Sequence, residues 1–593
     1  SVPLAVTAMG VSRFLSAVRL PVLPRLAQSK PPPHVLPRVL RPLASSRNYC
    51  SGVVRSPFDD IEIPEVSLSQ YVFEAQEPYA GKPAMVDGIS GISYTHGEFR
   101  DQCHRLGSAL TRLDVTKGDV VGLVSPNCPE FPIAFFAVAS IGAITTTVSS
   151  AYLADGIATQ LNSSSASVVV AHKGVLGAVM EACKQCPKVR HVIVIYPTPD
   201  DEKAGLLSFH KLLKDDGKAF PHSVKINPKE DVAVLPYSSG TTGLPKGVML
   251  THYNLVANLN QLQHKDISTL RDNRGEHQEV FMGILPYFHI YGMMPCMGIS
   301  LVTGSKTVTL PFLKPELYVK TLEEYKITYL HTVPPILDFL ANSDLVKPEH
   351  LNPTHTVLCG AAPIGPTLIN ELLKKFGAGI YFQEGFGMTE TSPVTHVTPR
   401  TKFVLGSTGV AIPNTLTKIV DLTTGKTLPP NGGEGELCVK GPQVMKGYYK
   451  NEEATKATID PDGWLHTGDI AKMDGDKNVF IVDRLKELIK VKGLQVAPAE
   501  LEDLIRQLPD VADVGVVGMP VGHAHGEAPR AFVVLTPGSQ LSLKTIENFV
   551  ECKVAPHKKL SGGLEYVEAI PRSPTGKILR RELKAMALSK MTQ

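Results

Sequence analysis

The fold of this 593-residue chain is decided by the stretch Tyr237–Leu250, YSSGTTGLPKGVML. It combines small hydroxyl side chains, glycines and a single lysine in one short loop. Because such a loop has no bulky side chains, its backbone N–H groups, its hydroxyls and its cation can converge on phosphate oxygens. The apolar residues just before it, Val232, Val234 and Leu235, predict a short strand that ends at the loop. We therefore expect a nucleotide phosphate site, formed by Ser238, Ser239, Gly240, Thr241, Thr242, Gly243 and Lys246.

Two other interpretations of this loop are weaker. A Ser/Thr/Gly cluster is also typical of a flexible linker, but linkers rarely contain Pro-Lys-Gly followed at once by an apolar run. The P-loop pattern GxxxxGK[ST] requires a Ser or Thr after the lysine to hold Mg²⁺. Here Lys246 is followed by Gly247, so the loop is not a P-loop.

Composition limits the class of protein. The chain is 43% hydrophobic and 20% charged, which is typical of a globular protein, and its length predicts at least two domains. The formal net charge is +3, with 60 basic and 57 acidic residues. Residues 1–58 contain eight basic residues and no acidic one, so the remainder has 52 basic against 57 acidic residues, a net charge of −5. A mildly acidic body without a basic patch gives no reason to expect a nucleic-acid partner.

The first 50 residues have the composition of a targeting segment. They are rich in Leu, Arg and Ser and contain no acid, which is typical of a mitochondrial transit peptide; the alternative is a plain disordered tail. We expect residues 1–50 to direct the protein to the mitochondrial matrix, with the cytoplasm and the peroxisome as the alternatives. The scattered cysteines suit a reducing compartment. No stretch stays apolar for the about 18 residues that a membrane helix needs, so we expect no transmembrane segment.

The order of elements predicts an α/β fold. Between residues 60 and 230 apolar strands such as Asp119–Ser125 and Ile144–Val148 alternate with helices such as Glu130–Gly142, which indicates βαβ units and parallel sheets. Short strands continue through Glu279–Leu285, Thr328–Thr332 and His355–Cys359. We expect a large N-terminal domain of parallel α/β sheets over residues 60–482.

The pattern changes toward the C-terminus. Dense Gly, Asp and Asn turns over residues 421–482 predict a small β-rich subdomain within the large domain. A charged segment, 483–486, follows and is the predicted hinge. Beyond it a smaller α+β domain, 487–593, begins with a helix at Pro498 and a strand at Val511–Val517.

Five further segments stand out: PYFHIYG around His289, CGAAP at 359–363, QEGFGMTE at 383–390, WLHTGDI at 464–470 and PRSPTGKI at 571–578. Each has an ordinary interpretation. His289 among aromatic residues could be a packed core histidine, Asp469 could belong to a turn, and Lys577 could be a solvated side chain.

The order of these segments resembles the adenylate-forming superfamily of acyl-CoA synthetases, luciferases and peptide-synthetase adenylation domains. The chain is most similar to 4-coumarate:CoA ligases and their medium-chain or aryl relatives. The resemblance extends over residues 60–585 and depends on eight motifs in the family's order: YSSGTTGLPKGVMLTH, PYFHIYG, CGAAP, EGFGMTE, GELCVKGP, GWLHTGDI, DRLKELIKVKG and PTGKI.

The resemblance implies an ATP-dependent acid–thiol ligase that works in two steps. A carboxylate first attacks the α-phosphate of ATP and gives an acyl-adenylate and pyrophosphate. The thiol of coenzyme A then displaces AMP and gives the thioester. Because the first step joins two anions, cations and N–H donors must neutralise the developing charge.

The resemblance also implies roles for residues in the ATP site. Thr389 and Glu390 would contact the α-phosphate and Mg²⁺, and Phe386 would stack on adenine at a position where the family often has Tyr. Asp469 would bind the ribose hydroxyls with support from Arg484, and Lys577 would bridge the carboxylate and the α-phosphate. The same motifs place Gly360, Ala361, Ala362, Gln383, Glu384, Gly385 and Gly387 around the nucleotide.

For the second step the resemblance implies that the C-terminal domain rotates about the hinge. Lys577 would leave the site, and Lys490 and Gln495 would enter it, with Lys492 and Gly493 beside coenzyme A. A glycine at this point lets the pantetheine approach closely. His289 would orient the acid, whose acyl pocket would be lined by His289, Tyr291, Pro393 and Val394.

We therefore expect ATP, Mg²⁺, coenzyme A and a small carboxylic acid, either a medium-chain fatty acid or an aryl or hydroxycinnamate-type acid, as the small molecules bound. The alternatives are a luciferase-like monooxygenase, which would give light and CO₂, and a non-catalytic nucleotide- or acyl-binding protein, which would release no pyrophosphate. A stand-alone aminoacyl-adenylating domain is a further alternative. The sequence makes no prediction about oligomeric state.

Overall fold

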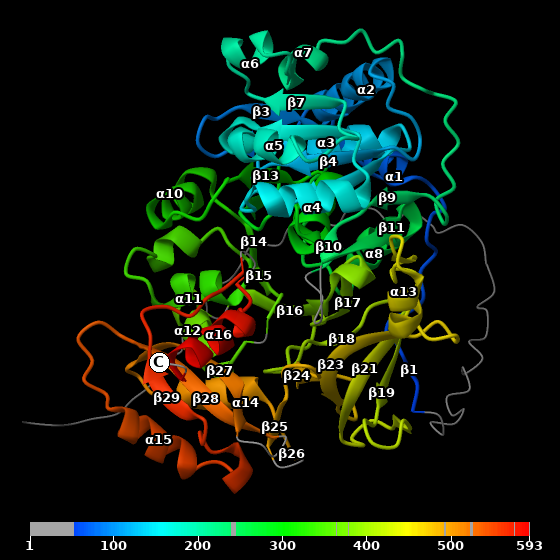
Figure 1. Ribbon diagram of the computed structural model, residues 1–593. Coiled ribbons are helices and arrows are strands. Elements are labelled where there is room, and N and C mark those ends of the chain that lie inside the picture. The colour runs from blue at the N-terminus through cyan, green and yellow to red at the C-terminus, as the bar shows by residue number, and fades with distance from the viewer. Residues whose placement is uncertain are drawn as a thin grey trace, which may run out of the picture. The chain divides into compact units, whose positions relative to one another are not determined.

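The computed structural model describes residues 52–238, 245–362, 364–377, 379–491, 494–521, 526–573 and 576–591, without the side chains of residues 495 and 591 (Figure 1). The predicted targeting segment, 1–50, lies outside the described residues. The same holds for Ser239, Gly240, Thr241, Thr242 and Gly243 of the predicted phosphate loop, for Lys492 and Gly493, and for the side chain of Gln495.

The first sheet has nine strands among the described residues, in the order β10-β11-β9-β5-β4-β6-β7-β8, with β22 paired to β11. The pairs from β9 to β8 are parallel, as the alternating pattern predicted. The strands are β4 (Val120–Val124), β5 (Ile144–Val148), β6 (Val168–His172), β7 (His191–Ile195), β8 (Leu207–Ser208), β9 (Val232–Val234), β10 (Tyr237–Ser238), β11 (Lys246–Thr251) and β22 (Gly447–Tyr448).

Helices cover both faces of this sheet, which explains why β4 is apolar at every position (Figure 1). Val121 and Leu123 point to the core cluster that contains α2 (His96–Arg112) and α3 (Glu130–Ser140). Val120 and Val124 point the other way, to the cluster of α4 (Ala154–Ser164) and α5 (Leu176–Cys183). The alternation is that of a strand buried on both sides.

The second sheet also has nine strands among the described residues, in the order β18-β17-β16-β15-β14-β12-β13-β2-β3. The pairs from β16 to β2 are parallel. The strands are β2 (Pro83–Asp87), β3 (Ser93–Thr95), β12 (Val280–Gly283), β13 (Lys306–Thr309), β14 (Tyr329–Thr332), β15 (Thr356–Cys359), β16 (Tyr381–Gly387), β17 (Val394–Val397) and β18 (Val410–Ala411). The predicted strands in this region agree with β12, β14 and β15 to within two residues.

The predicted β-rich subdomain is an antiparallel sheet in the order β1-β19-β21-β23-β24, with β20 on β19. Its strands are β1 (Val54–Arg55), β19 (Leu416–Val420), β20 (Thr427–Leu428), β21 (Glu434–Lys440), β23 (Leu465–Met473) and β24 (Val479–Arg484). The sheet is larger than the predicted range of 421–482. It includes β19, and β1 from the other end of the chain pairs with β19, which no local pattern reveals.

The C-terminal part has its own core, as the change in pattern predicted. It contains the hairpin β25 (Ile489–Val491) and β26 (Leu494–Val496), and the sheet of β27 (Val511–Val521), β28 (Gly526–Leu535) and β29 (Gly563–Tyr566). Its helices are α14 (Pro498–Ile505), α15 (Leu543–Glu551) and α16 (Arg580–Met591). Leu501 and Ile505 of α14 are fully buried in this core.

Asp483 and Arg484 of the predicted hinge are the last two residues of β24. The Asp483 carboxylate accepts hydrogen bonds from its neighbour's N–H, on Arg484, and from the Ala499 N–H at the start of α14, at 3.1 Å. The chain therefore enters the C-terminal part directly from a strand, and one side chain bonds to both parts.

The remaining helices connect the strands: α1 (Leu68–Ala75), α6 (Pro199–Lys203), α7 (Phe209–Leu212), α8 (His252–Leu262), α9 (Ile299–Val302), α10 (Pro315–Tyr325), α11 (Pro334–Asn342), α12 (Pro366–Phe376) and α13 (Glu452–Thr458). Short 3₁₀ turns lie at Glu77–Tyr79, Lys173–Val175, Pro348–Leu351, Thr389–Thr391 and Pro556–Lys558. A search of the described ranges finds no helix that is long and apolar enough to cross a membrane.

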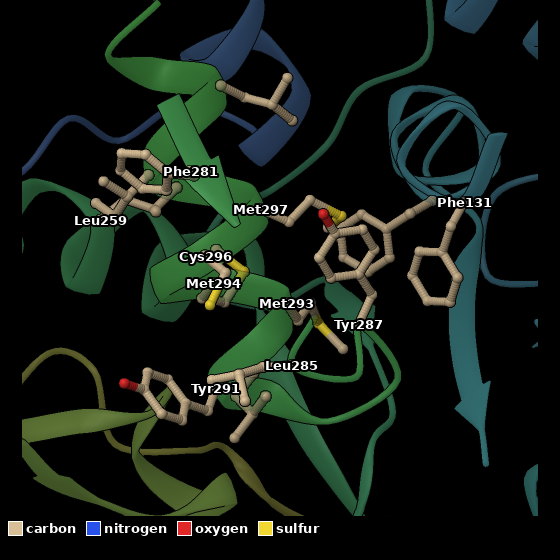
Figure 2. Close-up of a cluster of buried hydrophobic side chains, with 14 of the residues drawn as sticks. Phe131, Leu259, Phe281, Leu285, Tyr287, Tyr291, Met293, Met294, Cys296 and Met297 are labelled. Carbon is tan, nitrogen blue, oxygen red and sulfur yellow. The ribbon is translucent and has the colours of Figure 1, made fainter. Parts of the chain in front are cut away.

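A π-helix, η4 (Gly292–Gly298), follows β12 and is buried along its whole length. Figure 2 shows its methionines and cysteine in the core, with the Tyr287 ring facing Phe131 of α3 at a centroid distance of 5.6 Å. A Cβ on Gly292 would lie 2.2 Å from the Pro286 carbonyl oxygen, so this turn requires glycine. The segment between β12 and η4, which includes His289, is therefore anchored in the core.

A buried asparagine joins the two parallel sheets. Asn127, three residues beyond β4, donates from Nδ2 to the carbonyls of Gly283 and Leu285 at 3.0 and 2.8 Å. Its Oδ1 accepts from the Tyr287 N–H at 2.8 Å. Since Gly283 ends β12, one side chain fixes the carboxyl end of β4 against the carboxyl end of β12.

Asn127→Ala should lower the free energy of unfolding by about 3 kcal/mol, because it leaves buried backbone groups without their partner. Urea unfolding measures this change. The exposed Asn162, whose Nδ2 donates to the Gln185 carbonyl, provides the control, and Asn162→Ala should change the free energy by less than about 0.5 kcal/mol. Equal effects of the two substitutions would show that Asn127 does not join the sheets.

Candidate functional site

A cavity of about 1010 Å³ lies at the carboxyl ends of the parallel strands of both sheets. Its lining includes residues that follow β5, β9, β12 and β15, which is where open α/β sheets bind ligands. Sixteen of the sequence-predicted site residues line it: Ser238, Lys246, His289, Tyr291, Gly360, Ala361, Gln383, Gly385, Phe386, Gly387, Thr389, Glu390, Pro393, Val394, Arg484 and Lys577. The structure thus brings together side chains from six separate motifs.

Four predicted site residues do not line this cavity in the described part of the chain: Ala362, Glu384, Asp469 and Lys490. Glu384 lies on β16 between two residues that do, and strand alternation turns its side chain away from them. It is 5% exposed, and burial raises the pKa of its carboxyl to about 8. Lys490 is exposed on β25, where it pairs with Gln495 of β26.

Tyr448 organises the side of the cavity that the motifs assign to phosphate. Its hydroxyl donates to Oε1 of Glu390 at 2.8 Å, and the Lys246 Nζ lies 4.5 Å from the centroid of its ring. Tyr448 reaches this place because β22 pairs with β11, which begins at Lys246. One tyrosine therefore positions both the carboxylate and the lysine that the motifs assigned to metal and phosphate.

Asp469 and Arg484 form an ion pair at the edge of the cavity, which Arg484 lines and Asp469 does not. They face each other across β23 and β24, and Arg484 Nε lies 3.0 Å from Asp469 Oδ1. The other carboxylate oxygen, Oδ2, is buried without a hydrogen-bond partner among the described residues. Burial raises the pKa of Asp469, while the positive charges of Arg484 and Lys577 oppose that shift. A buried, unpaired acceptor beside the cavity fits a ligand that offers a hydroxyl donor.

Lys577 brings a further positive charge to the cavity, near Arg484 and Asp469. Burial and the charge of Arg484 lower the pKa of its ammonium, and the carboxylates of Glu487 and Asp469 partly restore it. Its loop closes through a hydrogen bond from its own N–H to the Ser573 Oγ at 3.1 Å. The ammonium is thus partly desolvated and faces the cavity, where an anion would replace its lost hydration.

His289 also lines the cavity, and its imidazole is neutral. Burial, with the nearby positive charge of Lys577, lowers the pKa of its imidazole to about 4. Its Nδ1 accepts a hydrogen bond from the Tyr291 N–H at 3.3 Å, which leaves the proton on Nε2. A neutral imidazole with a fixed donor can orient a carboxylate without competing for its charge.

The family of the chain follows from two matches. The AMP-binding enzyme family matches residues 72–449, and the AMP-binding enzyme C-terminal domain matches residues 500–577. The chain belongs to the AMP-binding enzyme family. The division between the two matched segments includes the predicted hinge.

Curated relatives match this AMP-binding enzyme along nearly its whole length. A protein named probable 4-coumarate–CoA ligase 1, from Dictyostelium discoideum, is 38% identical over 544 residues, which cover 89% of this chain and 97% of that protein. The 4-coumarate–CoA ligase of Pinus taeda is 38% identical over 556 residues, 92% of this chain and 100% of that protein. Among solved structures, ATP-bound MatB from Rhodopseudomonas palustris has a TM-score of 0.77 at 25% identity, covering 88% of this chain and 98% of that one.

Sequence reasoning missed several residues of this AMP-binding enzyme's cavity. Tyr448 has a local signal, the motif GYYK after GELCVKGP, but its contacts depend on the pairing of β22 with β11. Glu436 accepts hydrogen bonds from His466 Nδ1 at 2.7 Å and from the Gly468 N–H at 3.1 Å, and so holds the loop before Asp469. His331 of β14 also lines the cavity, in a run that reads as an ordinary buried strand.

Proposed function

We propose that this chain is an ATP-dependent acid–thiol ligase that forms an acyl-CoA through an acyl-adenylate and releases AMP and pyrophosphate. The observation that supports this most directly is the convergence of Lys246, Glu390, Lys577 and His289 on one cavity. Two cations, a carboxylate and a neutral imidazole are the groups needed to join a carboxylate to a nucleotide phosphate. The relatives named 4-coumarate–CoA ligase support the same reaction.

In the first step an oxygen of the acid attacks the α-phosphorus of ATP, the bond to the bridging β-phosphate oxygen breaks, and pyrophosphate leaves. Lys577 neutralises the charge that gathers between the carboxylate and the α-phosphate, and Lys246 does so at the β- and γ-phosphates. His289 donates from Nε2 to the acid and orients it for in-line attack. Phe386 stacks on adenine, and the free Oδ2 of Asp469 accepts from a ribose hydroxyl.

In the second step the sulfur of coenzyme A attacks the acyl carbon, the bond from that carbon to the AMP oxygen breaks, and the thiol proton passes to solvent. We place this step in a second arrangement of the C-terminal domain. The exposed position of Lys490 on β25, outside the cavity that Lys577 enters, supports this idea. The hinge is assigned to 483–486, and Lys490, Lys492, Gly493 and Gln495 form the coenzyme A side.

We assign Mg²⁺ to Glu390 and Thr389. The residues fit this ion, because Mg²⁺ binds through one or two carboxylates together with substrate phosphates and waters. Glu390 is 4% exposed, and Tyr448 orients its carboxylate beside the cavity. When bound, the ion supplies additional positive charge at the phosphates.

The acid is assigned to a medium-chain fatty or aryl class. The pocket beyond His289 is lined by Tyr291, Ile299 and Leu358, which suit an apolar chain or ring. The names of the curated relatives support an aryl acid.

Pyrophosphate release over a panel of acids tests this function. The panel runs from acetate to palmitate and includes benzoate and cinnamates, each with and without coenzyme A. We expect a peak in the medium-chain or aryl range, continuous turnover only with coenzyme A, and no release when EDTA removes Mg²⁺. Release that ignores coenzyme A, or no release with any acid, would contradict the ligase.

The two lysines should separate the half-reactions. Lys577→Ala should slow acyl-adenylate formation by about 100-fold or more while largely sparing thioester formation from supplied acyl-AMP. Lys490→Ala should do the reverse. Lys590→Ala, on the exposed end of α16, is the control and should leave both rates unchanged. If both variants lost the two half-reactions equally, the C-terminal domain would not adopt a separate arrangement for each half-reaction.

We also propose that residues 1–50 direct the protein to the mitochondrial matrix, on the strength of their basic and acid-free composition. A reporter fused to these residues should become protease-protected in isolated mitochondria. Replacing Arg13, Arg19 and Arg25 with Glu should stop the import. A reporter that remains accessible to protease would contradict mitochondrial import.

A further inference from the structure

Three side chains of metal-binding type meet in the β-rich subdomain, and the proposed reaction gives none of them a chemical role. Strands β21 and β23 lie side by side in its antiparallel sheet (Figure 1). Glu436 and Cys438 are two residues apart on β21, so their side chains leave the same face of the strand. His466 of β23 lies directly opposite Cys438 in the register. The pairing of the two strands therefore brings a carboxylate, a thiol and an imidazole together.

The distances between these side chains are close to those in a zinc site. Cys438 Sγ lies 3.5 Å from His466 Nδ1, which lies 2.7 Å from Glu436 Oε2, and the ligand atoms of the three residues lie within 4.8 Å of one another. A tetrahedral zinc ion binds nitrogen and oxygen at about 2.0 Å and sulfur at about 2.3 Å, which holds the ligand atoms roughly 3.3 to 3.6 Å apart. The sulfur and the nitrogen already have this separation.

The group combines a buried thiol with a route from the cavity. Cys438 is fully buried, and its sulfur has a further weak contact with the Glu436 carbonyl oxygen at 3.9 Å. The other two residues, Glu436 and His466, line the cavity described above. An ion can therefore reach the thiol from the cavity, and water on that side can supply a fourth ligand. A donor set and an entry path, which a metal site requires, are both present.

Neighbouring groups already orient the carboxylate and the imidazole. Glu436 Oε1 accepts a hydrogen bond from the Gly468 N–H at 3.1 Å, which leaves Oε2 for an ion. Asp460 Oδ2 lies 3.7 Å from Nε2, the other ring nitrogen of His466. Histidines that bind a metal through one nitrogen commonly present the other to a carboxylate, which fixes the ring and its proton. The surroundings of the group thus have the arrangement found around metal ligands.

We propose that Cys438, His466 and Glu436 form a binding site for a divalent cation of the zinc class, separate from the Mg²⁺ site assigned to Glu390. The ion is bound by Cys438 Sγ, His466 Nδ1 and Glu436 Oε2. This site goes beyond the proposed function and does not depend on it, because the three residues take part in neither step of the reaction.

The ligand set selects the ion. A thiolate and an imidazole favour Zn²⁺ and similar ions, whereas Mg²⁺ and Ca²⁺ prefer oxygen ligands. Burial and the negative charge of Glu436 raise the pKa of the Cys438 thiol to about 12, while the positive charge of Lys418 opposes this shift. The thiol is therefore protonated before the ion arrives. Binding breaks its S–H bond, forms a metal–sulfur bond and releases the proton to solvent, and His466 binds as a neutral imidazole with its proton on Nε2.

Titration with Co²⁺ tests the site directly. Co²⁺ accepts the same ligands as Zn²⁺, and a thiolate bound to it gives a charge-transfer absorption band in the near ultraviolet. The full chain, freed of metal, with its thiols reduced and Mg²⁺ in excess, is titrated with Co²⁺. We expect the band to saturate at one ion per chain and to disappear when Zn²⁺ is added. Absence of the band would overturn the proposal, because Cys438 would then not bind the ion.

Substitutions assign the ligands. Cys438→Ser and His466→Gln should each weaken Co²⁺ binding by more than about 10-fold, the least that loss of even an outer partner of a metal ligand costs. Cys438→Ser should also remove the band. The control is Cys552→Ser, since Cys552 is exposed and open to adventitious binding, and its loss should change neither the affinity nor the band. A band that survives Cys438→Ser, or that is lost in Cys552→Ser, would place the ion on another thiol and overturn the proposal.

Unfolding gives a second readout. An ion that binds only the folded chain stabilises it, so Zn²⁺ should raise the urea unfolding midpoint of the wild type and of Cys552→Ser but not that of Cys438→Ser. The midpoints without metal show whether each variant is folded, and His466→Gln serves the same comparison if Cys438→Ser is not. A Zn²⁺-induced shift that these variants share with the wild type would contradict the site.

The failure of this site and the failure of the proposed ligase are distinguishable. Neither the Co²⁺ band nor the unfolding midpoint requires an acid, ATP or coenzyme A. An enzyme that releases pyrophosphate but shows no band would refute only the metal site, whereas a band without any pyrophosphate release would refute only the ligase.

Discussion

The structure depends on one constraint: the carboxyl ends of two parallel sheets must meet at one place. Asn127 enforces it with three buried hydrogen bonds that join the end of β4 to the end of β12. Thr147 of β5 adds a fourth link, from its hydroxyl to the Phe288 carbonyl at 2.8 Å. Since the loops that follow parallel strands all leave from the same edge, this join concentrates the small-residue loops of both sheets around one cavity. The segment with His289 is held in place by the same contacts.

In the proposed function, the charged side chains around that cavity follow the order in which the parts of ATP and the acid bind. Lys246 and Glu390, both positioned by Tyr448, would lie beside the phosphates, and Arg484 and Asp469 would lie beside the ribose. Lys577 enters from the C-terminal domain, where the ion pairs of Arg580 with Glu487 and Glu502 hold the neighbouring turn. In the proposed mechanism Lys577, which belongs to the C-terminal domain, enters the site for adenylation and leaves it for thioester formation, while the nucleotide site stays unchanged. In the proposed function His289, whose imidazole is neutral, lies beyond the charged region and orients the acid.

Much of the fold could be predicted from sequence, because local patterns determine it. The predicted strand Ile144–Val148 agrees with β5 at both ends. Buried strands such as β4 can be recognised because their sequence is an unbroken apolar run. Lys246 could be assigned to the site from its own loop, whereas Glu390 and Lys577 could be assigned only through the resemblance of their motifs to a family; all three line the cavity. Other features depend on partners that are distant in sequence. The pairing of β1 with β19 and the contacts of Tyr448 need the sheets to be assembled first. Strand β24 continues to Arg484 because its partner β23 extends to Asp469.

The most direct test of this mechanism follows a carboxylate oxygen of the acid into the products. The acid is labelled with a heavy oxygen isotope in both carboxylate oxygens and turned over with ATP and coenzyme A, and the nucleotide products are weighed by mass spectrometry. If the carboxylate attacks the α-phosphorus and the thiol then displaces AMP, each AMP must hold one labelled oxygen and the pyrophosphate none. Two results would contradict an acyl-adenylate: labelled inorganic phosphate with ADP as the nucleotide product, or AMP without label. Either result would also contradict the assignment of the cavity to adenylation.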